Sequence, residues 1–368
     1  MRVLFITDHG IDGAGTRARI LSYLPYLQLY DIDGVVSPFF DRRLHRILHQ
    51  PGKYFMKGWL SSVATLKRVV DLIRVRKFDV TFIHREAFPF GPPIIEGMLA
   101  RLGRPLILDF DDALYVPYPY PSDTTTPVLY RLKRTGRQFT HLVKISHHVI
   151  AGNRILADWA RKHNPNITVI PTPVDTQYYT VKDYEHRVYE HVIIGWMGSH
   201  STIPELMSVQ NIFQRLVDRF GDKIEFLIVG DTRFRPVVPS MKVIPFQLET
   251  EIRDLHAFDI GIMPLNDNEW TRGKCAYKAL VYMAVGIPVV CSPVGVVNDF
   301  ILHGQNGFLA PNEEQWVEIL SMLIEDPELR RRVGIAGRQT VEEQFSAELW
   351  APIFAEVITR VANARSSA

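Results

Sequence analysis

Short apolar runs alternate with helical segments along the chain, and this alternation limits the folds that the sequence can adopt. In the first half, apolar runs lie at residues 2–8, 80–84, 105–110, 148–151 and 168–171. Helical patterns occupy residues 17–29 and 93–102. Uninterrupted apolar runs separated by helices are typical of parallel strands that are buried on both faces. The first half is therefore predicted to form an α/β domain around a parallel sheet.

The same pattern restarts in the second half of the chain. Further strands are expected at residues 192–197, 224–229, 242–244, 260–263 and 288–291. Because 368 residues exceed one common domain, two blocks of βα units predict two doubly wound domains rather than one barrel. The expected domains are residues 1–180 and 181–346, with a polar linker within 174–192. A last helix with one apolar face is expected at residues 347–364.

The bulk composition is that of a globular protein with enough apolar side chains for a large core. No apolar run approaches the about 18 residues that a membrane span requires. Residues 1–7 are too few before Asp8 to form a secretory signal, so they are expected to begin the first strand. The chain has two cysteines, Cys275 and Cys291, which form no disulfide framework and favour a reducing cytoplasm.

A net charge of +2 conceals an uneven distribution of charge along the chain. Residues 1–180 hold 24 Lys and Arg against 15 Asp and Glu, and residues 181–368 hold 18 against 25. The first half is thus expected to meet an anionic partner. Much of its positive charge lies in residues 52–78, mixed with large apolar side chains. This stretch predicts either a helix on an anionic membrane or an ordinary surface helix with one face on a sheet.

Residues 272–310 carry the strongest functional signal. A cationic loop with Arg272, Lys274 and Lys278 leads into a helix of small residues, then a Gly-Ile-Pro-Val-Val strand and a Ser-Pro-Val-Gly turn. Loops and helix N-termini at the carboxyl ends of parallel strands are where α/β proteins hold phosphates. The three cations fit an anion site, and a solvated basic turn is the alternative. Lys274 and Lys278 share a helix face if the helix has begun by residue 274.

A glycine-containing loop follows the first strand of each half. In the first loop, Gly13, Gly15 and Arg17 can bring backbone amides and a guanidinium to an anion, or they form a plain turn. Their spacing departs from G-x-G-x-x-G, so a dinucleotide-binding fingerprint is weak. In the second loop, the amides of Gly198 and Ser199 at a helix start suit a phosphate.

Polar side chains also end two strands of the first half. Asp109, Asp111 and Asp112 crowd one strand end, so at least one carboxyl pKa should be raised unless a cation compensates. These carboxylates fit a metal site, a metal-free site for a hydroxyl group, or simple cap and turn positions. His84 ends another strand and is either structural or in contact with a substrate.

The order of elements over residues 272–310 resembles the donor-nucleotide site of retaining glycosyltransferases of family 4, which have the GT-B fold. The stretch from Lys274 to Ala284, Lys-Cys-x-x-Lys-x-Leu-x-Tyr-Met-Ala, occurs in some of these enzymes. The resemblance covers nearly the whole chain. It implies two Rossmann-like domains that face a cleft, with the last helix crossing back to the first domain.

The chain departs from the family pattern at three places. Gly273 and Val281 occupy the two positions of the family's Glu-x7-Glu motif, whose carboxylates contact the sugar and the ribose in relatives. The Arg and Lys that many relatives carry after the loop at Gly198 are missing. A histidine that often precedes the strand-end aspartate in the first domain is also absent. The sugar contacts of relatives therefore cannot be carried over to this chain.

The resemblance implies transfer of a sugar from a nucleotide sugar to an acceptor hydroxyl, with retention of configuration and without a cofactor or metal ion. The donor is expected to be UDP-, GDP- or ADP-linked, and the acceptor a glycan, a lipid-linked molecule or a small molecule. Peripheral contact with an anionic membrane is an open expectation, and no nucleic acid is expected. The expected catalytic residues are Asp111, Asp112 and His84. The expected donor-binding residues are Gly13, Gly15, Arg17, Gly198, Ser199, Arg272, Lys274, Cys275, Ala276, Lys278, Gly295 and Asn298.

Three other functions compete with sugar transfer. The missing glutamates are compatible with a non-catalytic subunit that binds a nucleotide sugar. A nucleotide-sugar epimerase of the same fold is less favoured, because it needs carboxylates beside the anomeric carbon. A nicotinamide dehydrogenase is least favoured, because the chain lacks a good fingerprint and a ribose-binding acid at the expected distance.

Overall fold

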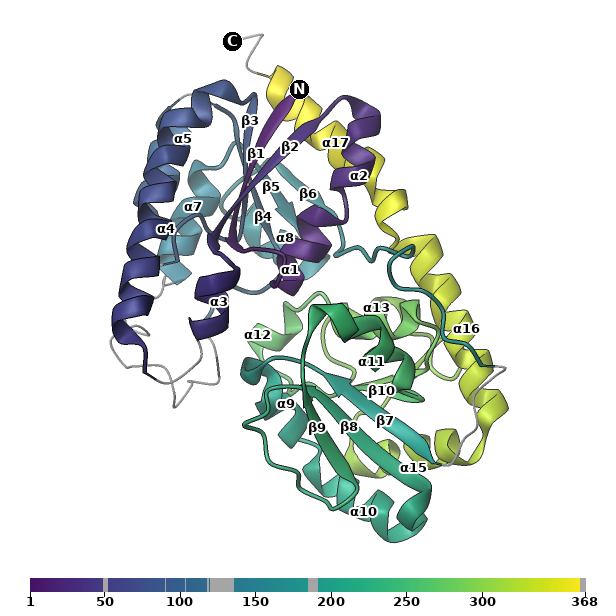
Figure 1. Ribbon diagram of the computed structural model, residues 1–368. Coiled ribbons are helices and arrows are strands. Elements are labelled where there is room, and N and C mark those ends of the chain that lie inside the picture. The colour runs from purple at the N-terminus through teal and green to yellow at the C-terminus, as the bar shows by residue number, and fades with distance from the viewer. Residues whose placement is uncertain are drawn as a thin grey trace. The chain divides into compact units, whose positions relative to one another are not determined.

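The computed structural model describes residues 1–48, 52–89, 91–102, 104–117, 119, 136–184 and 191–364. The chain forms two compact units (Figure 1). Unit 1 comprises Met1–Pro173 and Ala347–Ala368, and unit 2 comprises Val174–Ser346. The chain thus leaves unit 1, builds unit 2, and contributes its last helix to unit 1.

Unit 1 is built on a six-stranded sheet in which all paired strands are parallel. The strand order is β2-β1-β3-β4-β5-β6. The strands are β1 (Arg2–His9), β2 (Asp33–Phe40), β3 (Val80–His84), β4 (Leu106–Phe110), β5 (His148–Ala151) and β6 (Ile167–Val169). Every residue of β3, β4 and β5 is buried, which explains why the central strands are continuous apolar runs in the sequence.

Helices cover both faces of this sheet, with α4 and α5 on one side and α2 and α17 on the other (Figure 1). The helical elements of unit 1 are α1 (Ala14–Thr16), η1 (Arg17–Leu21), α2 (Leu24–Leu27), η2 (Gln28–Tyr30), α3 (Arg42–Leu48), α4 (Tyr54–Arg74), η3 (Val75–Lys77), α5 (Ile94–Arg101), α7 (Gly136–Ile145), α8 (Arg154–Arg161) and α17 (Ala347–Asn363).

The last helix, α17, supplies part of the core of unit 1. Phe354 is fully buried and stacks on Tyr23 with ring centroids 4.4 Å apart. It also meets Phe82 of β3 edge-on at 5.3 Å and lies 6.5 Å from Phe5 of β1. Aromatic groups of this size dominate core energetics. Unit 1 therefore depends on a segment that lies more than 170 residues from its other parts in the sequence.

Helices α3, α7 and α8 were not predicted from the sequence, and a strand and a helix near the N-terminus also differ from the prediction. Strand β2 was not predicted, and it contains Pro38, which cannot donate to a strand ladder. The structure places β2 at the edge of the sheet, where Pro38 is tolerated. The helix expected at residues 17–29 is divided into a π-helical segment, a short α-helix and a 3-10 turn. Pro25 contributes to this division because it lacks the amide hydrogen that a continuous helix requires.

Unit 2 has a second six-stranded parallel sheet with the order β12-β11-β10-β7-β8-β9. Its strands are β7 (Val192–Met197), β8 (Ile224–Gly230), β9 (Met241–Pro245), β10 (Ile260–Met263), β11 (Val289–Cys291) and β12 (Phe308–Leu309). All but β12 lie where the sequence predicts strands. β12 has only two residues, which is too short to produce a recognisable period.

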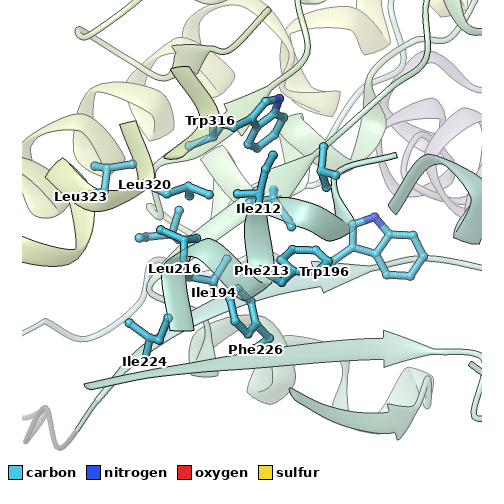
Figure 2. Close-up of a cluster of buried hydrophobic side chains, with 14 of the residues drawn as sticks. Ile194, Trp196, Ile212, Phe213, Leu216, Ile224, Phe226, Trp316, Leu320 and Leu323 are labelled. Atoms are coloured by element: carbon cyan, nitrogen blue, oxygen red, sulfur yellow. The ribbon is translucent and has the colours of Figure 1, made fainter. Parts of the chain in front are cut away.

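Helices also surround the sheet of unit 2, and Figure 2 shows one of its buried clusters, which includes Trp196, Phe213, Phe226 and Trp316. The helical elements are η4 (His200–Thr202), α9 (Ile203–Met207), α10 (Gln210–Phe220), η5 (Gly221–Lys223), η6 (Leu248–Thr250), α11 (Glu251–Ala257), α12 (Glu269–Arg272), α13 (Tyr277–Ala284), α14 (Val297–Phe300), α15 (Glu313–Glu325) and α16 (Pro327–Gln344).

The division between the units falls between Pro173 and Val174, so residues 174–180, expected in the first domain, belong to unit 2. The amide of Val174 donates a hydrogen bond to the carbonyl of Phe345 (2.8 Å), and Val174 forms a parallel bridge with Ser346. These contacts join the two ends of unit 2, which explains the boundary.

Replacing Phe354 by alanine should destabilise unit 1 by about 3–5 kcal/mol, because the substitution leaves a cavity among three aromatic rings. Leu349→Ala on the same helix is the control, because Leu349 is 45% exposed. Urea unfolding followed by circular dichroism measures both variants. Equal destabilisation by the two substitutions would contradict the packing of α17 in this core.

Candidate active site

The carboxyl ends of β1, β3 and β4 meet at one edge of the unit 1 sheet, because these neighbouring strands are parallel. A buried ionic cluster lies at this edge. Arg19 donates two hydrogen bonds to the two carboxylate oxygens of Asp109, one of them from Nε at 3.1 Å. Nδ1 of His84 lies 2.8 Å from Oδ2 of the same carboxylate. All three side chains are at most 1% exposed. Asp109 therefore holds both a fixed cation and the ring of His84 in place.

The second ring nitrogen of His84 faces the glycine loop. A β-carbon at Gly15 would lie only 2.9 Å from His84 Nε2 and 3.5 Å from an oxygen of Asp111. His84 Nε2 is buried and has no hydrogen-bond partner among the described residues. Glycine at position 15 thus lets the loop approach two of the three predicted catalytic residues, His84 and Asp111.

Arg85 neutralises the acidic strand end. It pairs with Asp112, lies 3.2 Å from Asp111 through Nε, and lies 3.7 Å from Asp8 through Nη1. Burial acts to raise the pKa of Asp111, but the charges of Arg85, His84 and Arg19 outweigh it and lower that pKa below its usual value. The compensating cation expected beside these carboxylates is therefore Arg85, whose backbone has a left-handed φ of 64°. Such a conformation is rare outside glycine, and it is a feature of functional sites.

Gly13 and Arg17 build the glycine loop itself. The amide of Arg17 donates to the carbonyl of Gly13 (3.0 Å), and its Nη1 donates to the carbonyl of Ile11 (3.1 Å). The guanidinium of Arg17 is thus bonded to its own loop. An anion would have to share the guanidinium with this carbonyl.

At the corresponding edge of unit 2, Gly198 and Lys278 lie together. A β-carbon at Gly198 would be 2.6 Å from Lys278 Nζ, which donates to the hydroxyl of Thr202 at 3.0 Å. The same ammonium lies 4.2 Å from the ring centroid of Trp196. Ser199 is the residue before η4 and its carbonyl accepts a bond from the amide of Thr202 (2.9 Å). Lys278 and the glycine loop are therefore parts of one site.

Lys278 has too little compensating charge around it. Burial lowers the pKa of Lys278 well below its usual value, and the nearby positive charge of Lys274 lowers it further. The carboxylate of Glu205 acts in the opposite direction without restoring it. Glu205 is itself 2% exposed and accepts a bond from the amide of Asn266 (2.7 Å). An anion beside Lys278 would favour the charged form of its side chain.

The predicted cationic loop is shorter in the structure, because Arg272 ends α12 and Lys278 lies within α13, which leaves Lys274 in the loop. Helix α13 begins at Tyr277, and Ala276 before it has a left-handed φ of 55°. Lys274 therefore lies outside the helix and shares no helix face with Lys278, although the two charges interact. Cys275 and Ala276 are 8% and 5% exposed, so what they offer a ligand is the backbone of this turn.

Arg272, Gly295 and Asn298 meet beside this loop. The carbonyl of Arg272 lies 2.7 Å from the point where a β-carbon of Gly295 would stand. Asn298 Nδ2 donates to the carbonyls of Gly295 and Pro293, both at 3.1 Å, and so holds the turn. The guanidinium of Arg272 is exposed and makes two hydrogen bonds to Asp267, at 2.6 and 3.0 Å. An anion that binds Arg272 would have to compete with this exposed carboxylate.

Sequence reasoning missed Arg19 and Arg85 as site residues. Arg19 stands between Ala18 and Ile20, all three of which are buried. The sequence did contain one signal for a site at Arg19, which is that a cation lies within an apolar stretch. No sequence pattern, however, indicates that its partner is Asp109, which lies 90 residues away. Among the described residues, no three His, Cys, Asp or Glu side chains come together as metal ligands would.

A family model described as "Glycosyl transferases group 1" matches residues 191–326. N-acetyl-alpha-D-glucosaminyl L-malate synthase from Bacillus anthracis is 24% identical over 239 residues, which span 60% of this chain and 60% of that enzyme. The fold is similar to that of HepE from Anabaena in complex with UDP and glucose, with a TM-score of 0.68, 16% identity, and coverage of 98% of this chain and 100% of that chain. Sucrose-phosphate synthase from Thermosynechococcus elongatus has a TM-score of 0.71, 12% identity, and coverage of 99% and 100%. The two parallel sheets of this chain thus form a GT-B fold.

Replacing Asp109 by asparagine should lower the free energy of unfolding of unit 1 by about 3–5 kcal/mol, because it leaves the buried Arg19 without its counter-charge. Asp158→Asn is the matched control, because the Asp158–Arg161 pair is exposed and should contribute less than about 1 kcal/mol. Urea unfolding measures both substitutions. Similar losses for the two variants would contradict the buried ionic cluster.

Proposed function

We propose that this chain, a member of the group 1 glycosyltransferases, transfers a sugar from a nucleotide-sugar donor to an acceptor hydroxyl with retention of anomeric configuration. The observation that carries this proposal is the position of Lys278 at the glycine loop of unit 2, beside a second cation and without sufficient counter-charge. This cluster lies within the residues that match the family model. The crystal structures of HepE with UDP and with UDP-glucose support a nucleotide-sugar donor.

Unit 2 would hold the diphosphate of the donor. Lys278 gains a counter-charge when a phosphate binds, and Lys274 and Arg272 add positive charge at the same edge. The amides of Gly198 and Ser199 contribute hydrogen bonds without further charge. Such pre-arranged cations and amides stabilise a departing nucleoside diphosphate, so we expect no metal ion to be required.

Unit 1 would contact the acceptor and the sugar through Asp111, Asp112 and His84. The bond between the anomeric carbon and the phosphate oxygen breaks, and the acceptor oxygen bonds to that carbon on the same face. The hydroxyl proton passes to an oxygen of the leaving phosphate, so no protein base is needed, and attack by the acceptor on the same face requires no protein nucleophile. Asp109 and Arg19 are positioning residues in this scheme, because they fix His84 rather than meet the substrate. The positive first half of the chain favours an anionic acceptor, such as a lipid-linked glycan phosphate.

A non-catalytic nucleotide-sugar-binding subunit is the second candidate function. It is favoured by the residues at the two family glutamate positions, Gly273 and Val281. Val281 is 5% exposed within α13, and neither residue supplies a carboxylate to a bound sugar. Both candidate functions predict that the chain binds a nucleotide-sugar donor, but only the transferase is expected to turn the donor over.

Incubation with UDP-, GDP- and ADP-linked sugars and a panel of acceptors tests the proposal. We expect transfer with one nucleotide, a product with the donor's anomeric configuration by NMR, and unchanged rates in the presence of EDTA. Inversion of configuration, or loss of activity with the chelator, would refute the corresponding part. Tight donor binding without hydrolysis or transfer would favour the non-catalytic subunit, and no binding of any nucleotide sugar would exclude both functions.

Replacing Lys278 by methionine should stabilise the protein and weaken nucleotide binding. Because the pKa of Lys278 is depressed in the folded state, the unfolded state binds the proton of the Lys278 ammonium more tightly. Lys278 therefore lowers the free energy of unfolding at neutral pH. This loss of stability becomes smaller as the pH rises toward 10.5, the usual pKa of lysine. We expect Tm at pH 7 to rise by about 2–4 °C, the shift that about 1 kcal/mol produces in a unit of this size. Binding of the preferred nucleoside diphosphate should weaken about tenfold, equivalent to about 1.4 kcal/mol.

Lys223→Met is the control, because Lys223 is an exposed lysine of the same unit. It should leave Tm and nucleotide binding unchanged. Calorimetry measures binding and thermal unfolding measures Tm. A Lys278→Met protein with lower Tm, or with undiminished nucleotide binding, would show that the assigned role of Lys278 is wrong.

A further inference from the structure

Helix α4 has its polar side turned toward the protein. Arg68 and Asp71 are buried at 0% exposure and form an ion pair of 2.8 Å. Arg68 also donates to the carbonyls of Ala87 (2.6 Å) and Thr7 (2.9 Å), and Asp71 accepts a bond from Ser37 (2.7 Å). The helix is therefore anchored to β2 and its surroundings by charge and hydrogen bonds, with a short apolar contact through Leu60 and Ala64 beside them.

The opposite side of α4 is apolar and exposed. Phe55, Trp59, Leu66 and Ile73 are 89%, 63%, 65% and 73% exposed. Their spacings of 4, 7 and 7 residues place them on one face along nearly the full length of the helix. The other exposed apolar residues of this helix, at 45–69%, are Tyr54, Met56, Val63, Val69 and Val70. This arrangement reverses the usual one, in which a surface helix buries its apolar face.

The apolar surface has a neighbour of the same character on α5. Helix α5 packs beside α4, and its Ile94 and Met98 are 63% and 44% exposed. Isolated apolar residues on a surface need no explanation, but a large contiguous patch marks a binding site. The exposed side chains of α4 are too many and too regularly spaced to be isolated residues.

The charge of the segment that contains α4 is almost entirely positive. Residues 52–78 contain seven Lys and Arg and a single acidic residue, Asp71. Asp71 is buried in its pair with Arg68, and its other oxygen lies 3.9 Å from Nε of Arg74, so among the remaining cations it offsets mainly Arg74. The basic residues apart from Arg68 are Lys53, Lys57, Lys67, Arg74, Arg76 and Lys77. An apolar face with aromatic residues and flanking cations is complementary to a lipid surface with negative head groups.

We propose that the exposed face of α4 binds the interface of an anionic lipid bilayer, with the helix axis in the plane of the membrane. Phe55, Trp59 and Leu66 enter the boundary between head groups and acyl chains, and the flanking lysines and arginines meet lipid phosphates. The contact is peripheral. None of the helices in the described ranges is both long and apolar enough to cross a bilayer. The proposal does not depend on sugar transfer, because vesicle binding requires no donor or acceptor.

Flotation of the full-length protein with lipid vesicles tests this proposal. We expect the protein to float with vesicles of phosphatidylcholine and phosphatidylglycerol, and to bind vesicles of phosphatidylcholine alone more weakly. Higher salt should reduce the binding, because lipid charge contributes to it. A variant with Phe55→Ser, Trp59→Ser and Leu66→Ser should lose about tenfold or more in partitioning, since each buried CH₂ group adds to membrane affinity.

The matched control replaces three exposed apolar residues that lie outside α4. Leu29, Leu302 and Ile335 are 78%, 58% and 48% exposed, and serine at these positions should leave vesicle binding unchanged. A second variant, with Lys57→Gln, Arg76→Gln and Lys77→Gln, keeps the apolar face. It should lose most of the preference for phosphatidylglycerol.

Three results would overturn the proposal. The first is that the protein does not bind anionic vesicles, and the second is that the α4 serine variant binds them as well as the original protein does. The third is that light scattering shows a dimer of the original protein, the serine variant is monomeric, and neither protein binds vesicles. The last result would identify a second copy of the chain as the occupant of this face. Thermal unfolding of each variant establishes that the changes in binding occur in folded protein, and the glutamine variant retains the test if the serine variant does not fold.

Discussion

Parallel pairing of the strands is the constraint on which the remaining structure depends. Because all paired strands within a sheet run in the same direction, the loops that follow them emerge at one edge. Residues that are far apart in the sequence, such as Arg19 and Asp109 or Gly198 and Lys278, meet at these edges for that reason. Each unit therefore places a cluster of charged side chains at the carboxyl ends of its strands and builds its hydrophobic core beside the sheet.

The two edges handle charge in opposite ways. In unit 1, the carboxylates are compensated by Arg19 and Arg85, and the pKa of Asp111 is lowered despite its burial. In unit 2, Lys278 lacks sufficient compensation and its pKa is depressed. Unit 1 thus has a charge-compensated cluster in which His84 Nε2 can still bond to a hydroxyl group, whereas unit 2 has a site whose electrostatics improve when an anion binds. This difference supports the assignment of the acceptor to unit 1 and of the donor phosphates to unit 2.

Helix α4 shows that hydrophobic patterning alone does not tell which face of a helix is buried. Its basic and apolar residues were compatible with a membrane helix or with an ordinary helix on a sheet. In the structure, a buried ion pair and its hydrogen bonds anchor the helix, and the apolar side is left outside. Further bonds reduce the cost of burying such a pair, and Arg68 obtains them from Ser37, Thr7 and Ala87, whereas Asp71 obtains one from Ser37.

The sequence by itself determined the fold class and most of the strands, because buried parallel strands leave uninterrupted apolar runs such as those of β3 and β7. It also located the cationic segment and the glycine loops, since residue type and local spacing are visible in one dimension. It did not reveal β2, because an edge strand with Pro38 lacks that signature, nor the partners of Asp109 and Asp111. Only the tertiary structure decided that Arg19 and Arg85 are the compensating cations, that Lys278 is short of counter-charge, and that α4 turns its apolar face outward. These properties depend on which groups lie within a few ångströms of one another and on which groups are removed from water. Folding determines the distances and the burial, because it brings together residues that are far apart in the sequence.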